Sequence, residues 1–531
     1  MAAIASAALS GETSCQSLPV TSSKTAMPRS SRVGAKSALA GSPTPRQLRV
    51  ALLDAEGKPM DEGRRKTLYV ADLHFEPERQ KSTLAGDGTV EIAATIRRAS
   101  LHAKIAVPDF GDTWTVADNE GEGYEKPTAT LDFVAEAARS RLADVERLVR
   151  SSRAAFSPEC VGHRDAAIEN LALAKKATGA TAARHNLAAL SHGLWAGEMA
   201  VVEDARHVIA TSRPRRDFLF GCNAFRYRAG TPYAAYFPQV LNYATLPFYL
   251  ARLEAQEGKP DYARVEEILA WCEKTGIRPK GHPLWWGNPS GIPRWLDGAS
   301  WADARKHCER VVARSVERYR GRIDLWDVIN EAHDWANGLK LTQEQEIEIT
   351  RVCCETARSK NSRATIVVNN CCPFGEYAAQ GRVSHGPVFD HVLTPLAYLD
   401  RLMEAGVQFD VVGVQIYFPA RDMMAIGKLL GEYARFGKVV HVTELGVRTE
   451  PGRPGAAPTE WHQPWCEKIQ ADWVEWFYTM AYARREIGAI TWWDFAEPAF
   501  IRSGAFLRED QTPREMFFRL KALKKSWRLR S

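Results

Sequence analysis

The feature that most constrains the fold is an alternation of short apolar runs and long amphipathic helices that begins near Asp217. Runs rich in Val, Ile and aromatic residues predict buried strands, and apolar residues spaced three or four apart predict the helices between them. The expected strands are Phe218–Gly221, Leu241–Leu246, Ile277–Trp285, Ile323–Glu331, Thr365–Cys371, Val411–Phe418, Val439–Val447 and Ala489–Phe495. The expected helices include Tyr262–Thr275, Trp301–Tyr319, Gln343–Ser359, Phe389–Glu404 and Trp465–Arg485. Eight such units predict an α/β fold, the (β/α)8 TIM barrel, over residues 216–531.

The chain before the barrel divides into three segments of different texture. Residues 1–44 are rich in Ala and Ser and contain a single acid, Glu12. This composition weakly resembles an organellar transit peptide, although a disordered tail or a misplaced start codon explains it almost as well. The compartment therefore stays open, with a secreted and an organellar protein both compatible with this leader.

Residues 45–127 have the pattern of a small β-rich domain. The runs Leu68–Phe75, Val90–Ile96 and Leu101–Val107 are separated by Gly/Asp turns. A sugar-binding module and a structural cap are both compatible with it.

Residues 128–215 then form an expected helical connector. Its first helix shows one apolar face, formed by Leu131, Val134, Ala138, Leu142, Val145 and Val149. A second helix is expected near Asp165 and a third over Leu187–Ile209.

Composition excludes several classes of protein. The net charge of +6 is small for 531 residues and no dense basic face is evident, so a nucleic-acid partner is not expected. No apolar run approaches the roughly 20 residues of a membrane span. The ten Cys residues lack zinc-ligand spacing, and no other ligand cluster stands out, so no metal or organic cofactor is implied. The 16 Trp residues suit the stacking of sugar rings, although core packing explains many of them.

Two glutamates stand where expected barrel strands end. Active sites of this fold lie at the carboxyl ends of the strands, where Glu331 ends the fourth expected strand and Glu444 lies near the end of the seventh. A lone Glu there is weak evidence, because barrel acids often form salt bridges. Two of them can face each other across the barrel mouth. Glycoside hydrolysis needs such a pair, since one carboxyl protonates the leaving oxygen while the other acts as nucleophile or base.

The residues around both glutamates carry a family resemblance. Residues 217–523 resemble glycoside hydrolase family 10, the endo-β-1,4-xylanase family. The matching segments are Trp326–Glu331 for the acid/base motif, Thr443–Leu445 for the nucleophile motif, Lys280–Trp286 for the third-strand motif, Ile292–Trp295 for the following segment and Trp492–Asp494 for the eighth strand. The resemblance implies a retaining mechanism with Glu331 as acid/base and Glu444 as nucleophile. It further implies sugar contacts by His282, Trp286, Asn330, Gln415, Tyr417 and Trp493. Asn330 is expected to bond the sugar 2-hydroxyl or the nucleophile.

The sequence also departs from the family pattern. The family's polar segment after the second strand is replaced here by Thr245–Ala251, which is largely apolar and aromatic. The His that contacts the nucleophile is replaced by Tyr417, whose hydroxyl can still donate a hydrogen bond. Gly287 stands for a second His, and Gly446 for an acid. Asn369 and Asn370 resemble an Asn–Asp pair with the acid replaced by an amide. The catalytic groups are thus kept while the substrate cradle is altered.

The leading hypothesis is a retaining endo-β-1,4-glycosidase that hydrolyses xylan-like plant polysaccharide through a glycosyl-enzyme. The first alternative is a glycosidase acting on a different β-linked glycan, because the cradle is altered. The second is a carbohydrate-binding pseudoenzyme, which the retention of both glutamates argues against. In each case the partner is a polysaccharide or oligosaccharide.

Overall fold

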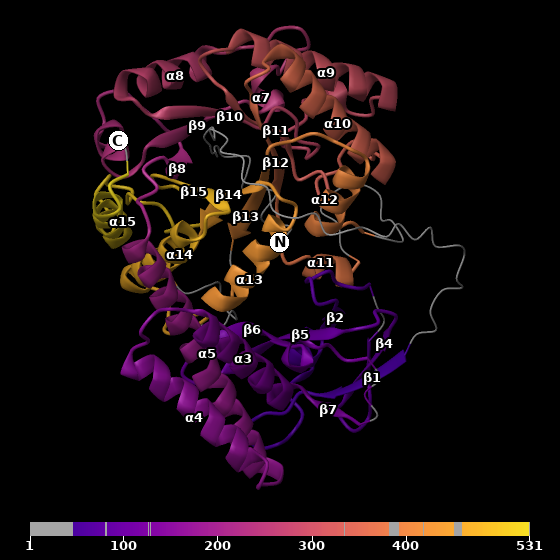
Figure 1. Cartoon of the computed structure of the whole chain (residues 1–531). Helices are drawn as coiled ribbons and strands as arrows, with labels where there is room; N and C mark the ends of the chain where they lie inside the picture. Colours follow the sequence, from indigo (N-terminus) through magenta and orange to yellow (C-terminus); the bar gives the residue numbers. More distant parts are fainter. Residues whose placement is uncertain are drawn as a thin grey trace, which may run out of the picture.

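A computed structural model of the chain describes residues 46–79, 82–125, 127, 129–333, 335–381, 392–417, 419–450 and 459–529. The expected leader, residues 1–44, lies outside these residues. Figure 1 shows the barrel above a smaller N-terminal region, in which helices lie beside two small sheets. Among the described helices, none combines the length and the apolar character needed to cross a lipid bilayer.

Eight parallel strands close into a barrel in chain order, which confirms the (β/α)8 expectation. They are β8 (Leu219–Asn223), β9 (Tyr243–Pro247), β10 (Arg278–His282), β11 (Leu325–Asn330), β12 (Thr365–Asn370), β13 (Val411–Tyr417), β14 (Val439–Gly446) and β15 (Ile487–Trp492). Each overlaps one of the eight runs expected from the sequence. The glutamates of the fourth and seventh strands therefore share the carboxyl end of one barrel.

Helices surround the barrel on its outside. They are α6 (Pro232–Val240), α7 (Leu250–Leu253), α8 (Ala263–Thr275), α9 (Trp301–Arg318), α10 (Gln343–Lys360), α11 (Glu376–Ala379), α12 (Pro395–Glu404), α13 (Met423–Ala434), α14 (Glu467–Ala483) and α15 (Glu515–Ser526), with a 3-10 turn at Arg294–Leu296. Helix α12 begins later than expected, because Thr394 caps it by accepting a hydrogen bond from Ala397 N and Pro395 occupies its first turn. Residues 389–391 of the expected helix lie outside the described part of the chain.

The inside of the barrel is apolar near the start of the strands and polar near their ends. Near the start of the strands, one apolar cluster contains Leu325, Val367 and Val411, and another contains Leu219, Tyr243 and Ala489. Two residues further along β11 the inward position is Asp327, fully buried. The register of the ladder then shifts between Asp327 and Ile329, and again in β14 between Val442 and Leu445. Irregularities of this kind redirect side chains, and here they immediately precede Glu331 and surround Glu444.

The N-terminal region contains two small sheets, in the order β3-β4-β1-β7 and β2-β5-β6. Their strands are β1 (Arg46–Ala51), β2 (Tyr69–Ala71), β3 (Ser82–Leu84), β4 (Val90–Ala94), β5 (Ser100–Val107), β6 (Gly111–Ala117) and β7 (Leu131–Asp132), with the short helix α2 (Glu62–Arg65) and a 3-10 turn at Asn119–Gly121. The expectation that Leu131 belongs to the first helix is wrong. Leu131 pairs in parallel with Val50 of β1, and Asp132 caps the helix that follows.

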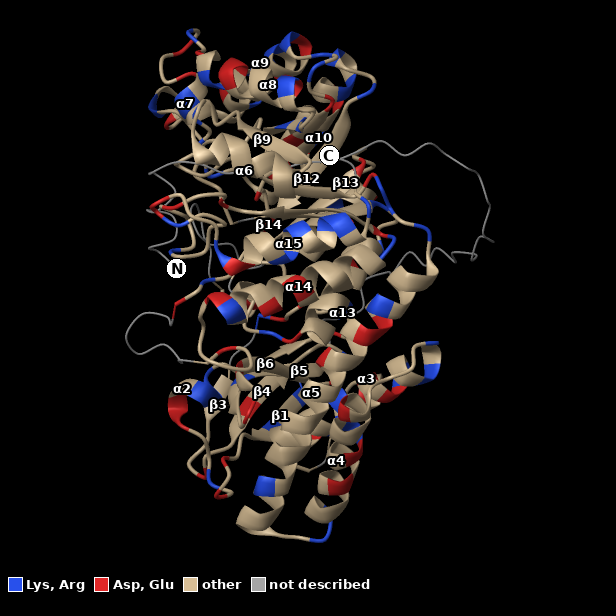
Figure 2. Ribbon diagram, turned by 90° about the vertical axis from the view of Figure 1, so that its left-hand side faces the viewer, with Lys and Arg blue, Asp and Glu red and all other residues tan. Residues whose placement is uncertain are grey.

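Three helices connect these sheets to the barrel: α3 (Phe133–Ser151), α4 (Pro158–Ala174) and α5 (Gly179–Thr211). Helices α4 and α5 begin about two turns earlier than expected. Ser157 caps α4 through Cys160 N, and Pro158 occupies its first position, where the missing N–H costs nothing. Helix α5 packs against α3 and α4 and also touches α13 and α14 of the barrel. The ribbon of Figure 2 shows both acidic and basic residues along these outer helices.

The edge of strand β6 is joined by hydrogen bonds to two loops at the carboxyl end of the barrel. Trp114 N donates to Ala420 O at 2.9 Å, in the loop after β13. Asp112 N donates to Thr459 O at 2.9 Å, in the loop after β14, and His462 N donates to Phe110 O at 2.7 Å. The N-terminal sheet therefore lies directly against the loop layer that surrounds the barrel mouth.

Candidate active site

Glu331 is the first residue after β11 and is buried, with 9% of its surface exposed. Its backbone adopts φ +55°, a left-handed conformation that is strained for a residue with a Cβ. Trp286 Nε1 donates to its Oε2 at 3.0 Å, and Gln415 Nε2 donates to its Oε1 at 3.0 Å. Burial raises the pKa of Glu331 to about 6, against the opposing effect of these hydrogen bonds. Near pH 6 this carboxyl is therefore divided between its protonated and its ionised form.

Glu444 lies in β14 and is more deeply buried than Glu331. Tyr417 donates from its hydroxyl to Oε2 at 3.0 Å, and Asn369 Nδ2 donates to Oε1 at 3.0 Å. Burial, followed by the negative charge of Glu331, raises the pKa of Glu444 well above its usual value. The two carboxyls therefore titrate as an interacting pair, and between their two pKa values the pair holds one proton and one negative charge.

Side-chain amides connect the two carboxyls. Gln415 Nε2, which donates to Glu331, also lies 3.2 Å from Asn330 Oδ1. Asn369 Nδ2, which donates to Glu444, lies 2.8 Å from the same Asn330 oxygen. Asn330 thus accepts from both amides, while Asn369, not Asn330, contacts the expected nucleophile. This chain of hydrogen bonds fixes the position of one carboxyl relative to the other.

His282, at the end of β10, is fully buried beside Glu444. Its Nδ1 lies 2.6 Å from Asp327 Oδ2, and its Nε2 lies 4.0 Å from Glu444 Oε1. Burial lowers the pKa of His282 against the effect of Asp327, so the ring is neutral. Because a carboxylate can only accept, the proton is on Nδ1 and Nε2 is left as an acceptor, 3.3 Å from the Tyr249 hydroxyl.

Aromatic rings form the walls of the site. The Trp493 ring meets Tyr417 edge-on at 5.6 Å and His282 at 6.1 Å. The Trp286 ring meets Tyr249 at 5.7 Å. Trp492, which precedes Trp493 in the sequence, is buried, and its Nε1 donates to Gly504 O at 2.8 Å. All eight residues that the sequence predicted for the site are therefore brought together at the barrel mouth.

Both glycines that differ from the family pattern, Gly446 and Gly287, lie where a side chain has little room. A Cβ at Gly446 would lie 3.0 Å from Ile501 and 3.3 Å from the Tyr417 ring, which Gly446 faces across the ladder. A Cβ at Gly287 would lie only 2.4 Å from the carbonyl oxygen of Ala336. The Tyr417 ring and Ile501 thus occupy space that a side chain at position 446 would need.

Three residues of the site were missed by reasoning from the sequence. Lys280 and Asp327 form a fully buried ion pair that orients His282. Charged residues at inward positions of otherwise apolar strands were the available signal for both. Tyr249 lies in the largely apolar and aromatic segment Thr245–Ala251, and its hydroxyl reaches His282.

The fold and the site together define a class of protein. A (β/α)8 barrel whose fourth and seventh strands place two buried, interacting carboxyls at the mouth has the arrangement that glycoside-bond chemistry uses. The sequence profile of glycosyl hydrolase family 10 matches residues 248–515, just over half of the chain. The chain belongs to this family.

The individual relatives share only about a quarter of their residues with this chain over the aligned segments. Endo-1,4-beta-xylanase B of Neocallimastix patriciarum is 24% identical over 216 residues, which cover 39% of this chain and 24% of that protein. Endo-1,4-beta-xylanase 3 of Hypocrea jecorina is 26% identical over 215 residues, 40% of this chain and 57% of that protein. The chain thus spans between a quarter and somewhat over half of these relatives. Native xylanase 10B of Thermotoga maritima aligns with 61% of this chain and 99% of its own, at 18% identity and a TM-score of 0.48.

Proposed function

We propose that this protein is a retaining endo-β-1,4-glycosidase that hydrolyses xylan-like polysaccharide. The observation that carries the proposal is the pair Glu331 and Glu444, buried at the ends of the fourth and seventh strands and connected through Asn330 and Asn369. Membership of glycosyl hydrolase family 10 supports the reaction class. The names of the relatives in two fungi support xylan as the default substrate.

In the proposed first step, the Glu331 carboxyl gives its proton to the glycosidic oxygen as the bond to the anomeric carbon breaks. A Glu444 oxygen attacks that carbon and forms a glycosyl ester. In the second step Glu331, now ionised, takes a proton from water while the water oxygen attacks the same carbon and Glu444 leaves. Tyr417 and Asn369 stabilise Glu444 whenever it carries its charge, since both donate to it.

A mechanism-based label tests this proposal. A 2-fluoro xylobioside with a good leaving group should inactivate the enzyme and leave its sugar on Glu444, as found by peptide mapping. Glu331→Ala should slow labelling, and Glu509→Ala, which changes an exposed acid outside the site, should not. Absence of a label on Glu444, together with no hydrolysis of any β-linked glycan, would refute the proposal.

Tyr249 supports a second candidate, a glycosidase for a different β-linked glycan. Its hydroxyl lies 3.3 Å from His282 Nε2 and its ring packs on Trp286, so a sugar on this side of the site meets an aromatic side chain. A panel of β-1,4-xylan, β-glucan and β-mannan separates the two candidates. Xylan as the clearly best substrate would reject the second one.

For the N-terminal residues 45–127 we infer the role of a structural cap, within the expected division of the chain at residues 45, 128 and 216. The hydrogen bonds of β6 to Ala420 and Thr459 support this role. Trp114→Ala should lower the temperature of a single unfolding transition of the whole chain. Separate transitions for the cap and the barrel would contradict it.

A further inference from the structure

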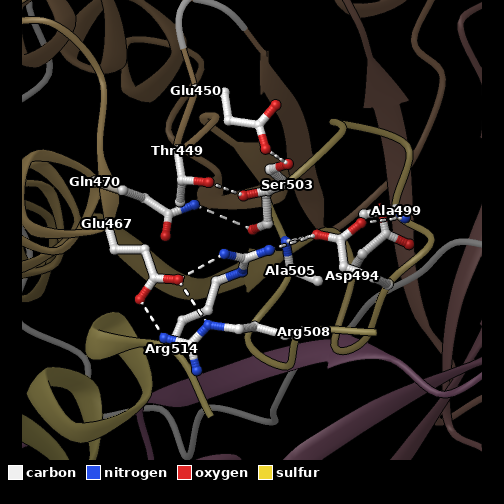
Figure 3. Close-up of polar contacts among 12 residues, drawn as sticks. Thr449, Glu450, Glu467, Gln470, Asp494, Ala499, Ser503, Ala505, Arg508 and Arg514 are labelled. Carbon is white, nitrogen blue, oxygen red and sulfur yellow. Dashed lines mark hydrogen bonds and ion pairs between the residues drawn. The ribbon is translucent and has the colours of Figure 1, made fainter. Parts of the chain in front are cut away.

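The segment that follows β15 is held in place by two separate sets of polar contacts. One set is at its start, where Asp494 lies with 4% of its surface exposed. The other set holds Ser503, Gly504 and the residues after them to the loop after β14 and to α14, as Figure 3 shows. The residues that form this second set with the segment are Thr449, Glu450, Glu467, Gln470, Arg508 and Arg514.

Asp494 uses both oxygens of its carboxyl group to hold the start of the segment. Phe500 N donates to Oδ2 at 2.7 Å, and Asn223 Nδ2, at the end of β8, donates to Oδ1 at 3.3 Å. The same Asn223 amide also donates to the carbonyl oxygen of Trp493. The backbone of Phe500 is therefore fixed to the carboxyl ends of the barrel strands, although it lies 6 residues after Asp494 in the sequence.

Phe500 and Trp493 enclose the ring of Tyr417. The Phe500 ring meets the Tyr417 ring at 5.0 Å, and the Trp493 ring meets it at 5.6 Å. On the side of β14, Gly446 leaves room for the same ring, since a Cβ there would lie 3.3 Å from it. Two of these three neighbours of Tyr417 thus belong to the segment that Asp494 holds.

The hydroxyl of Tyr417 depends on this enclosure for its direction. It donates to Glu444 Oε2 at 3.0 Å. A ring that is free to change its side-chain torsions would carry the hydroxyl away from that oxygen. Groups that act on reacting atoms keep their geometry when packing locks their rotamers, and a misplacement of about 1 Å can cost on the order of 100-fold in rate.

Asp494 is an unfavourable residue for stability alone. Burial raises its pKa from 3.8 to about 7, against the hydrogen bonds from Phe500 and Asn223 and the charge of Arg226, which lower it. Because the folded protein disfavours the ionised form, this acid lowers the unfolding free energy increasingly as the pH rises from 3.8 to about 7. Acids with strongly raised pKa values cluster at functional sites.

From these contacts we infer that Asp494 is a positioning residue for the reaction: by holding Phe500 against Tyr417, it keeps the Tyr417 hydroxyl directed at Glu444. Asp494 acts through the two rings, since no hydrogen bond among the described residues joins it to Glu444 itself. The inference rests on the proposed function, in which Glu444 is the nucleophile, and adds to it the segment that holds the donor of this nucleophile in place.

A double-mutant cycle on an aryl xylobioside tests this inference. Asp494→Ala should lower kcat about tenfold and leave KM nearly unchanged, because Tyr417 is displaced from Glu444 while the groups proposed to bind the sugar are kept. In the Tyr417→Phe background, which has no hydroxyl to direct, the same change should have almost no further effect on kcat. Asp494→Asn, which keeps an oxygen for Phe500 N, should recover most of the loss. Additive losses in the two backgrounds would overturn the inference.

Glu450→Ala is the matched control. Glu450 is an exposed acid of the loop after β14 that holds the same segment at Ser503, whose hydroxyl donates to it at 2.5 Å. This variant loosens the segment away from Phe500, so it should keep the wild-type kcat. A loss equal to that of Asp494→Ala would show that any loosening of the segment has the same effect, and would also overturn the inference.

A fluorine NMR measurement keeps the inference separate from the proposed function. With 3-fluorotyrosine at position 417, the full chain should give a fluorine resonance that moves or broadens in Asp494→Ala and stays in place in Glu450→Ala. A resonance that Asp494→Ala leaves unchanged would overturn the inference. A wild-type enzyme that hydrolyses no β-linked glycan would instead refute the proposed function, and the resonance would still decide whether Asp494 holds Tyr417.

Discussion

Glu198 and Glu444 are both glutamates with almost no exposed surface, and the two have different neighbours. Glu198, on helix α5, accepts hydrogen bonds from Met423 N at 2.7 Å, Trp461 Nε1 at 2.9 Å and His462 Nε2 at 2.5 Å. Those donors belong to the loop after β14 and to the start of α13. Beside this contact, a second buried pair joins Arg141 to Asp422 at 2.6 Å. Burial raises the pKa of Asp422, Arg141 lowers it, and the charge of Glu198 raises it further, so the acid beside Glu198 has a cationic partner.

At the barrel mouth, by contrast, the neighbouring acid Glu331 forms no ion pair among the described residues, whereas Asp422 beside Glu198 is paired with Arg141. Amide and hydroxyl donors hold Glu444 as firmly as Glu198 is held, yet the charge of Glu331 opposes its ionisation. Burial and hydrogen bonding alone therefore do not distinguish an acid that performs chemistry from one that connects two parts of a protein. A neighbouring acid without a cationic partner, which leaves unfavourable like-charge energy in the folded state, does.

Removing each acid in turn tests whether Glu444 serves catalysis and Glu198 serves stability. Glu444→Ala should reduce kcat/KM on an aryl xylobioside by a factor on the order of 10⁴ or more, since no other group can take the place of the nucleophile. Thermal stability should fall less than in Glu198→Ala, because the loss of two hydrogen bonds is offset by the removal of a charge that Glu331 repels. Residual activity within tenfold of wild type would remove Glu444 from the mechanism.

Glu198→Ala should have the opposite pattern. It leaves the donors of Met423, Trp461 and His462 buried without their acceptor, and such losses cost about 3–5 kcal/mol. Urea unfolding should show this decrease, whereas kcat on the folded protein should change much less than in Glu444→Ala. A variant as stable as the wild type would show that α5 is not fastened to the barrel through Glu198.

Tyr417→Phe tests one donor to Glu444 while keeping the ring that packs on Gly446. The loss of a hydrogen bond to a charged group is worth about 1.5–3 kcal/mol, or roughly 10- to 100-fold in kcat/KM. The nearby Tyr249→Phe is a suitable comparison, since its hydroxyl faces His282 and not the nucleophile. Equal losses in both variants would argue against a special role for Tyr417.

The smallest expected effect concerns stability and pH. The pKa of Glu331 is raised from 4.5 to about 6 in the folded protein. The protonated carboxyl therefore stabilises the folded state fully below about pH 4.5, and this contribution to the unfolding free energy is lost as the pH rises through 6. Glu331→Gln should therefore raise the unfolding free energy by roughly 2 kcal/mol at pH 7 and by nothing at pH 4. A gain that is equal at both pH values would contradict this linkage.

The barrel could be predicted from the sequence because its strands are short, mostly apolar runs separated by amphipathic helices. Glu331 and Glu444 could be predicted because each is an acid at or near the end of such a run. Residues whose roles depend on distant partners could not be found in this way. Leu131 is a strand residue only because it pairs with Val50. Glu198 connects α5 to the barrel loops only because Trp461 and His462, more than 260 residues later in the sequence, donate hydrogen bonds to it. The early start of α4 was readable from Ser157-Pro158, a local capping signal that was overlooked.

The edge of strand β6 has a consequence for the order of folding. Its N–H groups at Asp112 and Trp114 find their partners at Thr459 and Ala420, which leave the ribosome more than 300 residues later. At the usual rate of synthesis this delay amounts to roughly 15–60 s. During that time β6 is an unpaired sheet edge on the nascent chain, and unpaired edges are where chains associate wrongly. Slow translation of the barrel thus prolongs the vulnerable stage of the N-terminal sheet, and chaperones that shield this edge would have their largest effect before residue 459 emerges.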